Sequence, residues 1–485
     1  MTLVLLVLLL ATLALMAADA PLDVGSQRQL FIDRRFIAAS EGLSLVMEKP
    51  TKAGVVLRAD RPWEAAQLGA YSTIIHEHGQ FRLWYDCIAS LHPREVRYVA
   101  YATSSDGVSW EKKPLGNFEF AGSRVNNLLF EMTEGALFVD PHGPPEQRYK
   151  YLGMLPGKGL GVNTSPDGLH WQLAASPVFP FTCDTQNMAF WDDRIGRYVA
   201  YLRNWTPLRA VSRVEMDDIM APWPYRRDLP PNRAWGDHVP PPLGEEVPVV
   251  FHYDEQDPPD SDHYTPCVVK YPWAADAYFM FPAAYQHYPP PPQGRYGNDG
   301  PLEIQMAASR DGVSWSRVDR SAFIPLGQPG SGEEGCLYAF PSLVRVGDEL
   351  WLYYTAYPLT HGAPYEPYSG TMRRVVLRLD GFVAAAFAWT GGSLVTPPLR
   401  FSGDRLELNL DTEALGRAQV ELVGPDDQPL PGYTLADCDP IVGNHVHRLV
   451  TWHGEPAIKA ASPLRLRIVA RNTRLYAFQF LGGGQ

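Results

Sequence analysis

Three carboxylates stand where they could act together on a substrate. Asp184 lies in the polar segment Cys183–Asn187, directly before an apolar, strand-like stretch, and Glu334 precedes another such stretch. Asp299 lies on a long loop, in the sequence Asn-Asp-Gly-Pro. Cleavage of a glycosidic bond commonly uses two carboxyl groups that face each other across the sugar, one protonated and one ionised. We therefore predict that Asp184 and Glu334 are catalytic, with Asp299 as the alternate.

Each of these carboxylates also has a structural interpretation. Asp184 could cap a turn, with Gln186 and Asn187 bonding to nearby backbone, and Glu334 could belong to a solvated acidic loop. The residues around Asp299 are a turn signal by themselves. Three polar residues at the entrance of a central strand favour a function for Asp184, as the base or as the group that tunes the pKa of the acid.

Sugar binding needs aromatic faces and side chains with several hydrogen-bonding groups. Aromatic and histidine side chains occur at predicted strand entries or loops, and Arg203 ends an otherwise apolar strand with a fixed fork of donors. For any single aromatic residue, core packing is the alternative. The predicted substrate-binding residues are Trp63, Glu64, Gln186, Asn187, Arg203, Tyr264, His287, Tyr338 and His361.

A repeated turn motif indicates where the strands that position these residues begin and end. The pattern Ser-x-Asp-Gly-x-x-Trp occurs at residues 104–110, 165–171 and 309–315. Ser and Asp accept hydrogen bonds from the backbone of a turn, Gly supplies a positive φ, and Trp covers the end of the hairpin. We therefore interpret the repeated Asp as structural. The spacing of 61 and then 144 residues predicts a degenerate copy between the second and third turns.

The repeat predicts five antiparallel units between residues 56 and 382. Each unit offers a first strand, an aromatic-rich second strand and a third strand that leads to the turn. The predicted first strands cover residues 71–75, 136–139, 187–191, 265–269 and 341–345. Five such units indicate an all-β chain with a five-bladed β-propeller, and the shorter alternating strands of residues 383–485 indicate a β-sandwich. Residues 21–55 are predicted to be an entry segment that packs on the propeller or closes it.

Composition narrows the possible partners. The chain has 485 residues, a formal net charge of −12 and no basic stripe, which argues against nucleic acid as a partner. Its 5 cysteines are scattered singly, so neither a disulfide framework nor a zinc site is expected. We expect no cofactor. The acidic residues 254–262 and the propeller channel leave calcium open as an alternative.

The N-terminus predicts export. Residues 2–17 form an apolar run that ends in small residues, which is typical of a secretory signal peptide over residues 1–20. A membrane anchor is the alternative, although the run is short for a membrane span. We expect a secreted or periplasmic protein with no integral membrane span once the signal is removed.

The whole chain resembles a family of glycosyl hydrolases predicted in planctomycete-type bacteria, and its architecture resembles glycoside hydrolase families 32 and 43. The resemblance rests on residues 30–33, 184–187, 298–301 and 437–440. It implies a five-bladed propeller, and it implies that Glu334 matches the segment that carries the general acid in family 43. In the first unit those families place a further Asp, where this chain has only Asp60 and Glu64.

These observations predict an exported carbohydrate-active protein. The first interpretation is a glycoside hydrolase that acts through a pair of carboxylates in the propeller funnel. The alternative is a non-catalytic propeller that binds glycans. Catalysis requires two funnel carboxylates that face the same bound sugar, whereas binding alone does not.

Overall fold

The chain is built from β-strands. The computed structural model describes residues 20–91, 95–224, 246–289 and 297–482, and within these ranges it contains 34 strands and no α-helix. Two short 3-10 helices, η1 (Pro62–Glu64) and η2 (Pro145–Gln147), interrupt the strands. No helix in the described part of the chain is long and apolar enough to cross a membrane. The predicted signal peptide, residues 1–20, lies outside the described residues except for Ala20.

The chain divides into two compact units. The larger unit comprises Gln29–Asp33 and Leu45–Ala385, and the smaller unit comprises Met1–Arg28, Arg34–Ser44 and Ala386–Gln485. The boundaries fall within β4 (Leu43–Met47) and β27 (Val383–Phe387), and next to the short strand β2 (Gln29–Leu30).

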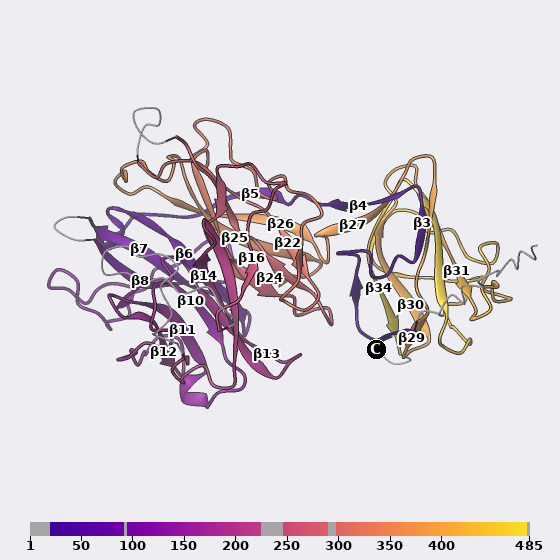
Figure 1. The fold of residues 1–485 in the computed structure, drawn as a ribbon, viewed down its shortest axis with the longest axis horizontal. Coiled ribbons are helices and arrows are strands. Elements are labelled where there is room, and N and C mark those ends of the chain that lie inside the picture. The colour runs from indigo at the N-terminus through magenta and orange to yellow at the C-terminus, as the bar shows by residue number, and fades with distance from the viewer. Residues whose placement is uncertain (1–19, 92–94, 225–245, 290–296, 483–485) are drawn as a thin grey trace, which may run out of the picture. The chain divides into compact units, whose positions relative to one another are not determined.

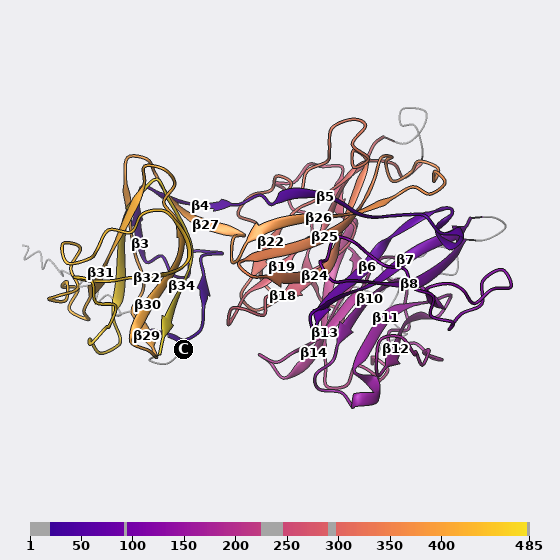
Figure 2. The same ribbon diagram turned by 180° about the vertical axis from the view of Figure 1, so that it is seen from behind.

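Five sheets make up the larger unit. Sheet I contains β6 (Gln67–Glu77), β7 (Gln80–Ser90), β8 (Val96–Ser104) and β9 (Leu128–Glu131). Sheet II contains β10 (Thr133–Val139), β11 (Tyr149–Leu155) and β12 (Gly159–Ser165). Sheet III contains β13 (Met188–Asp192), β14 (Arg197–Trp205), β15 (Arg209–Met216) and β16 (Val249–Phe251). The strands of sheets I and II lie side by side in both views (Figures 1 and 2).

The remaining two sheets follow the same plan with additions. Sheet IV contains β18 (Val268–Lys270), β19 (Tyr278–Met280), β22 (Ala307–Ser309) and β23 (Trp315–Ser316). Sheet V contains β24 (Cys336–Val346), β25 (Glu349–Tyr357) and β26 (Thr371–Arg378), extended at one edge by β17 (Ser261–His263), β20 (Ala283–Gln286) and β21 (Leu302–Ile304). Its other edge is β5 (Thr51–Arg58), so a strand from the start of the chain completes the last sheet.

Local sequence explains the hairpins. Glu77 pairs with Gln80, which leaves His78 and Gly79 as a two-residue loop between β6 and β7. Both have positive φ, 52° and 74°, as the turn that matches strand twist requires. The second strands are buried on both faces, which suits their aromatic side chains. In β7, for example, the adjacent residues Trp84 and Tyr85 point to opposite faces and both are fully buried.

The first strands of the five sheets contact one another in a cycle. β6 contacts β10 and β24, β10 contacts β13, and β18 contacts β24. Between β13 and β18, the Val268 amide donates to Met188 Sδ at 2.8 Å. Each predicted first strand overlaps β6, β10, β13, β18 or β24. The cycle places the beginnings of five strands around one space.

The repeated turn links neighbouring sheets. In its first copy, Asp106 Oδ1 accepts hydrogen bonds from the amides of Val108 and Ser109 at 2.8 and 2.7 Å, which lower the Asp106 pKa to about 2. Gly107, at φ 70°, presents its carbonyl to the Tyr353 hydroxyl of sheet V at 2.9 Å. The Asp therefore shapes the turn, and the Gly carbonyl makes the link.

The other two copies repeat this arrangement. The Trp84 indole of sheet I donates to the Gly168 carbonyl of sheet II at 2.7 Å, and the Tyr201 hydroxyl of sheet III donates to the Gly312 carbonyl of sheet IV at 2.8 Å. Sheet III lacks the turn, and it is tied to sheet II by the Tyr198 hydroxyl, which donates to Asp140 at 2.8 Å. Each link joins a sheet to its predecessor.

Residues 30–33 are also held within the larger unit. Arg310, from the third repeated turn, donates to the Leu30 carbonyl at 2.7 Å and to both carboxylate oxygens of Asp33 at 3.0 Å. The same guanidinium contacts Asp276 at 2.9 Å. Residues 30–33, one of the segments on which the family resemblance rests, therefore have a structural role in the larger unit.

The smaller unit contains two larger sheets and a strand pair. One sheet has the order β3 (Ala39–Glu41), β28 (Gly392–Val395), β33 (Arg465–Arg471) and β31 (Arg417–Val423). The other contains β32 (Asn444–Leu449), β30 (Arg405–Asp411) and β34 (Thr473–Leu481), and β1 (Leu22–Gly25) pairs with β29 (Leu399–Phe401). Alternate residues are buried, as Leu406, Leu408 and Leu410 show in β30.

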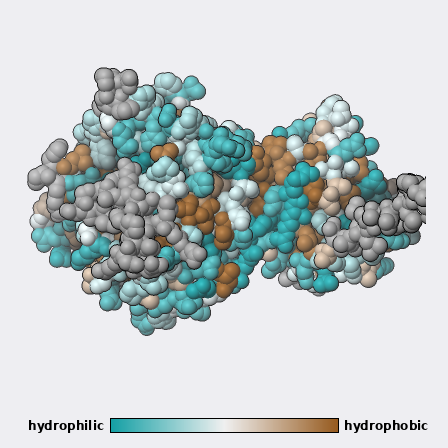
Figure 3. Space-filling view, in the orientation of Figure 1, coloured by the Kyte–Doolittle hydropathy of each residue, from teal (hydrophilic) through white to brown (hydrophobic). Residues whose placement is uncertain are grey.

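Residues 437–440 secure loops of this unit. Asp437 accepts from the Thr434 hydroxyl at 2.8 Å and from His453 at 2.9 Å, and Asp439 accepts from Thr451 Oγ1 at 2.6 Å and the Gly454 amide at 2.7 Å. On the face drawn in Figure 3, hydrophilic residues cover most of the described surface of each unit and hydrophobic ones form scattered patches.

We expect the links between sheets to contribute measurably to stability. Tyr201→Phe removes only the hydroxyl that bonds to Gly312, so it should lower the free energy of unfolding of the larger unit by about 1 kcal/mol. Tyr368→Phe, at an exposed position, is the matched control. Chemical denaturation of both variants measures the difference, and equal stabilities would show that the link contributes nothing.

Candidate active site

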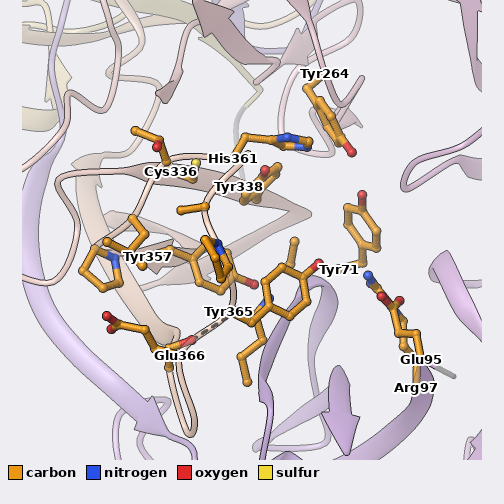
Figure 4. A pocket seen from close by; sticks show the side chains of 18 of the residues that line it. Tyr71, Glu95, Arg97, Tyr264, Cys336, Tyr338, Tyr357, His361, Tyr365 and Glu366 are labelled. Carbon is orange, nitrogen blue, oxygen red and sulfur yellow. Dashed lines mark hydrogen bonds and ion pairs between the residues drawn. The ribbon is translucent and has the colours of Figure 1, made fainter. Parts of the chain in front are cut away.

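A cavity of about 300 Å³ opens in the larger unit. Tyrosine side chains surround it in Figure 4, with Glu95 and Arg97 together near Tyr71. The lining residues that carry polar or aromatic groups are Gln67, Tyr71, Glu95, Arg97, Glu134, Asp184, Tyr264, Cys336, Tyr338, Tyr357, Thr360, His361, Tyr365, Glu366 and Ser369. Asp184, Tyr264, Tyr338 and His361 are among the residues that the sequence predicted.

The cavity lies where the cycle of first strands begins. Tyr71 is near the start of β6, Glu134 is the second residue of β10, and Cys336 is the first residue of β24. Asp184 and Tyr264 lie four residues before β13 and β18. Later residues of the same strands line other cavities, including 74–76 of β6 and 343–345 of β24. The polar residues therefore converge at one end of the cycle.

Glu134 and Asp184 form a carboxylate pair in this cavity. Burial and, next in size, the negative charge of Asp184 raise the pKa of Glu134 to about 7, against the opposing effect of Arg97 and Arg203. Glu134 has a left-handed backbone with φ 58°, at a register shift between β10 and β11. A non-glycine residue in this conformation is held there by its surroundings. The pair thus contains one carboxyl group that is readily protonated at neutral pH.

Arg203 anchors the Asp184 side of the site. Its side chain is 1% exposed, and its Nη1 lies 3.8 Å from the Asp184 carboxylate. Nε donates to the Tyr264 carbonyl at 3.0 Å, and the guanidinium lies over the Tyr264 ring at 4.4 Å. Asn187 Oδ1 accepts from the Arg203 amide at 2.9 Å. Arg203 therefore holds Asp184, Asn187 and Tyr264 in one arrangement.

Gln186 and Asn187 position the segment instead of lining the cavity. Gln186 Nε2 donates to the Ser72 carbonyl of β6 at 3.3 Å and to the Gly135 carbonyl of β10 at 3.2 Å. Asn187 Nδ2 donates to the Cys183 carbonyl at 2.6 Å. These bonds tie the Asp184 segment to the two strands that carry Tyr71 and Glu134.

A third carboxylate lies behind the cavity. Asp86 of β7 is buried, and its burial raises its pKa to about 6. Arg97 Nη1 contacts it at 3.2 Å, and Arg97 also pairs with Glu95. A Cβ at Gly69 would lie 2.2 Å from Asp86 Cγ, so a glycine is required opposite this carboxylate. Arg97 therefore connects the buried Asp86 to Glu95 at the cavity wall through two ion pairs.

Tyrosines form much of the cavity wall. Tyr338 meets Tyr71, Tyr264 and Tyr357 edge to face, with ring centroids 6.5, 5.8 and 6.0 Å apart. Tyr365 lies at an exposed position on the same cavity. These rings combine apolar faces with hydroxyl groups, as sugar binding requires.

Asp299 supports the segment that carries His361. Its Oδ1 accepts from the amides of Gly300 at 2.8 Å and Gly362 at 3.0 Å, and the His361 amide donates to the Gly300 carbonyl at 3.0 Å. Burial lowers the pKa of His361 to about 4, so the ring is neutral at pH 7. Asp299 is buried and is not among the residues that line the cavity.

Glu334 lies away from the cavity lining. Its carboxylate accepts from the Gly330 amide at 2.9 Å and from Ser331 Oγ at 3.3 Å, which closes the turn. The neighbouring Glu333 is buried, with Lys52 at 3.0 Å and the Tyr354 hydroxyl at 2.7 Å. Neither carboxylate faces Asp184 across the cavity.

The other predicted binding residues are engaged elsewhere. Trp63 packs against Phe120 with centroids 5.8 Å apart, and Glu64 accepts from the Tyr85 hydroxyl at 2.7 Å and contacts Lys112 at 2.8 Å. His287 lies 3.2 Å from Asp262. None of the three lines the cavity.

Metal-binding groups are not clustered in the described ranges. No set of three or more His, Cys, Asp or Glu side chains there is placed to hold an ion. The acidic loop near residue 254 is neutralised, because Arg317 and Arg320 both contact Asp254 and Asp257. All five cysteines are buried and free.

The sequence prediction missed Glu134, Asp86, Glu95 and Arg97. Glu134 stands in the run Thr-Glu-Gly-Ala, where nothing distinguishes it from a surface residue. Asp86 offered a signal, since it is a carboxylate within the apolar, aromatic strand β7. A buried charge of this kind requires a partner, and Arg97 on the paired strand is that partner.

No protein-family model matches the chain, and no curated protein matches it. Solved structures that resemble it are glycoside hydrolase-like proteins. A glycoside hydrolase is 12% identical, with a TM-score of 0.44, over 68% of this chain and 92% of the other. A glycosyl hydrolase from Bacteroides ovatus is 14% identical, with a TM-score of 0.42, over 67% of this chain and 96% of the other.

A third similar structure comes from work on the GH130 family of mannoside phosphorylases, which contains glycoside hydrolases that target β-1,2 mannosidic linkages in Candida mannan. It is 14% identical, with a TM-score of 0.43, over 73% of this chain and 97% of the other. At such identities and TM-scores, similarity does not assign a reaction to this chain.

We expect Asp299 to act through backbone positioning. Asp299→Ala leaves two amides without their acceptor and should lower the free energy of unfolding by about 1 to 3 kcal/mol. Asp299→Asn keeps an oxygen acceptor and should restore most of that loss. Denaturation of the two variants measures this difference, and an Asn variant as unstable as the Ala variant would contradict the positioning role.

Proposed function

We propose that the chain is a glycoside hydrolase in which Glu134 and Asp184 cleave the glycosidic bond. The observation that carries the proposal is that these two carboxylates share one small cavity and that the pKa of Glu134 is raised to about 7. A carboxyl group that is protonated near neutral pH can donate its proton to the leaving oxygen. The second, ionised carboxylate then activates water or attacks the anomeric carbon.

The fold of the larger unit fits this role as a five-bladed β-propeller. Five sheets whose first strands contact one another in a cycle support this interpretation, as does the completion of sheet V by β5. The cavity then lies at the mouth of the central funnel. We propose that the smaller unit is a β-sandwich.

The surrounding charges fit the proposed roles of Glu134 as the proton donor and Asp184 as the base or nucleophile. The Glu134 proton is favoured by burial and by the nearby charges of Asp184 and Asp86. Arg203 stands beside Asp184 and can stabilise the negative form that acts on the sugar. The tyrosines and His361 supply ring faces and polar groups for the sugar hydroxyls. The mechanism uses these side chains and needs no cofactor.

The proposed location is outside the cytoplasm. The apolar N-terminal run supports export through a signal peptide, and an extracellular or periplasmic enzyme would meet polysaccharides there. The substrate is a carbohydrate. The overall negative charge disfavours nucleic acid as a partner.

Substitution of the two carboxylates tests the reaction. Glu134→Gln should lower kcat/KM on a panel of polysaccharides and aryl glycosides by about 10²- to 10⁴-fold, because the general acid is lost. The loss should be much smaller for dinitrophenyl glycosides, whose leaving group needs no proton. Asp184→Asn should impair both substrate classes.

Glu334→Gln is the matched control, since Glu334 closes a turn away from the cavity lining. Its kcat/KM should stay within about twofold of the wild type. Hydrolysis that is unaffected by Glu134→Gln and Asp184→Asn would exclude this pair, and sugar binding without any turnover would favour the non-catalytic alternative.

The pH dependence of kcat/KM gives a separate test. Glu134 must be protonated to act, so the rate should fall as the pH rises through about 7 and should approach a tenfold loss per pH unit above it. On a glycoside whose leaving group needs the proton, the residual activity of the Glu134→Gln variant should lack this alkaline limb, because its amide does not titrate. An unchanged limb in the variant would assign it to another group.

A further inference from the structure

The cavity has an excess of negative charge. Among the described residues, three carboxylates line it besides the protonated Glu134, namely Glu95, Asp184 and Glu366, and Asp86 lies behind its wall. Two guanidinium groups balance them, that of Arg97 in the lining and that of Arg203 behind Asp184. A ligand in the cavity therefore meets more negative than positive charge.

Both arginines are already committed to protein groups. Arg97 is shared between Asp86, at 3.2 Å, and Glu95. Arg203 binds the Tyr264 carbonyl through Nε and Nη2, and its buried Nη1 forms an ion pair with Asp184 at 3.8 Å without a hydrogen bond in the described part of the chain. His361 adds no positive charge, because burial keeps its pKa near 4. An acidic ligand would thus have to compete with protein carboxylates for either guanidinium.

The tyrosine rings of the wall favour a ligand with a positive charge. Tyr71, Tyr264, Tyr338, Tyr357 and Tyr365 all line the cavity and are drawn around the same space in Figure 4. The faces of such rings attract cations, and their hydroxyls bond to sugar hydroxyls and amines. The tyrosine rings and the carboxylates therefore both favour a cationic ligand over an anionic one.

The size of the cavity limits how much of a glycan enters. Its volume of about 300 Å³ lies at the lower end of the range for ligand pockets. A space of this size suits a terminal sugar and part of the next one better than the middle of a long chain.

We infer that the cavity selects its sugar by charge: it takes a terminal residue without a carboxylate or sulfate group, and a protonated amine on that ring strengthens binding. This selectivity rests on the proposed function, because it assigns the cavity to the sugar whose bond is cleaved. Uronic acids are disfavoured by repulsion from the carboxylates, and amino sugars are favoured by attraction to them and to the tyrosine rings.

Matched sugars that differ in charge test this inference. Glucosamine, glucose and glucuronic acid form one set, and the galactose and mannose sets supply the other common ring configurations. Calorimetric titration at pH 6, where the amines are protonated, should show that in any set that binds, the amino sugar binds about three- to tenfold more tightly than the neutral one. The uronic acid should bind at least about tenfold more weakly than the neutral sugar.

Two variants test whether the cavity carboxylates cause the preference for amino sugars over uronic acids. Glu95→Gln and Glu366→Gln each remove a cavity carboxylate that is not part of the proposed catalytic pair, so each should reduce the affinity ratio of amino sugar to uronic acid by about threefold or more. Glu146→Gln, on the exposed helix η2, removes one charge outside the lining and should leave the ratio unchanged.

The outcomes separate this inference from the hydrolase proposal. Equal or tighter binding of uronic acids, or no binding of any set, would overturn the charge selectivity even if the protein hydrolyses glycosides. The expected ranking without any turnover would support the selectivity and count against hydrolysis. A ratio that falls equally in all three variants would show that total charge, and not the cavity, sets the preference.

Discussion

The structure depends on one constraint, which is that five first strands begin around the same small space. Hydrogen bonds link each of sheets I to IV to the sheet before it in the cycle, and β5 completes sheet V. Residues far apart in the sequence, such as Glu134 and Asp184, are thereby brought into one cavity. The two carboxylates, Tyr71 and Tyr264 come from four separate segments, and residues 357–369 add a further part of the wall, so no single segment of sequence contains the site.

Bringing carboxylates together in a buried place is costly unless charge or protonation offsets it. The protein uses both. Arg97 and Arg203 are placed among the carboxylates, and the remaining excess is relieved where Glu134 takes up a proton near neutral pH. Removal of Arg97 would leave the buried carboxylate of Asp86 without its partner, and removal of Arg203 would take away the cation beside the half-buried Asp184, so these two residues serve the fold and the site together.

The sequence predicted the framework better than the site. The period of the repeated turn located the first strands and directed attention to Asp184, because turn chemistry and strand alternation are local properties. Glu334 and Asp299 were also predicted to be catalytic, yet their carboxylates bond to nearby backbone amides. Glu134 was missed because its half-buried position and its left-handed backbone arise from packing between sheets, which local sequence does not reveal.

Two carboxylates in this protein illustrate how surroundings decide a role. Asp106 occurs in a motif that the chain contains three times, but it is exposed and accepts hydrogen bonds from two turn amides, which hold its pKa at about 2. It is ionised at any physiological pH and has no proton to give. Glu134 lies in an unremarkable stretch, but burial and the charge of Asp184 bring its pKa to about 7. The donors and charges around a carboxyl group, and not its repetition in the sequence, therefore decide whether it can act as an acid.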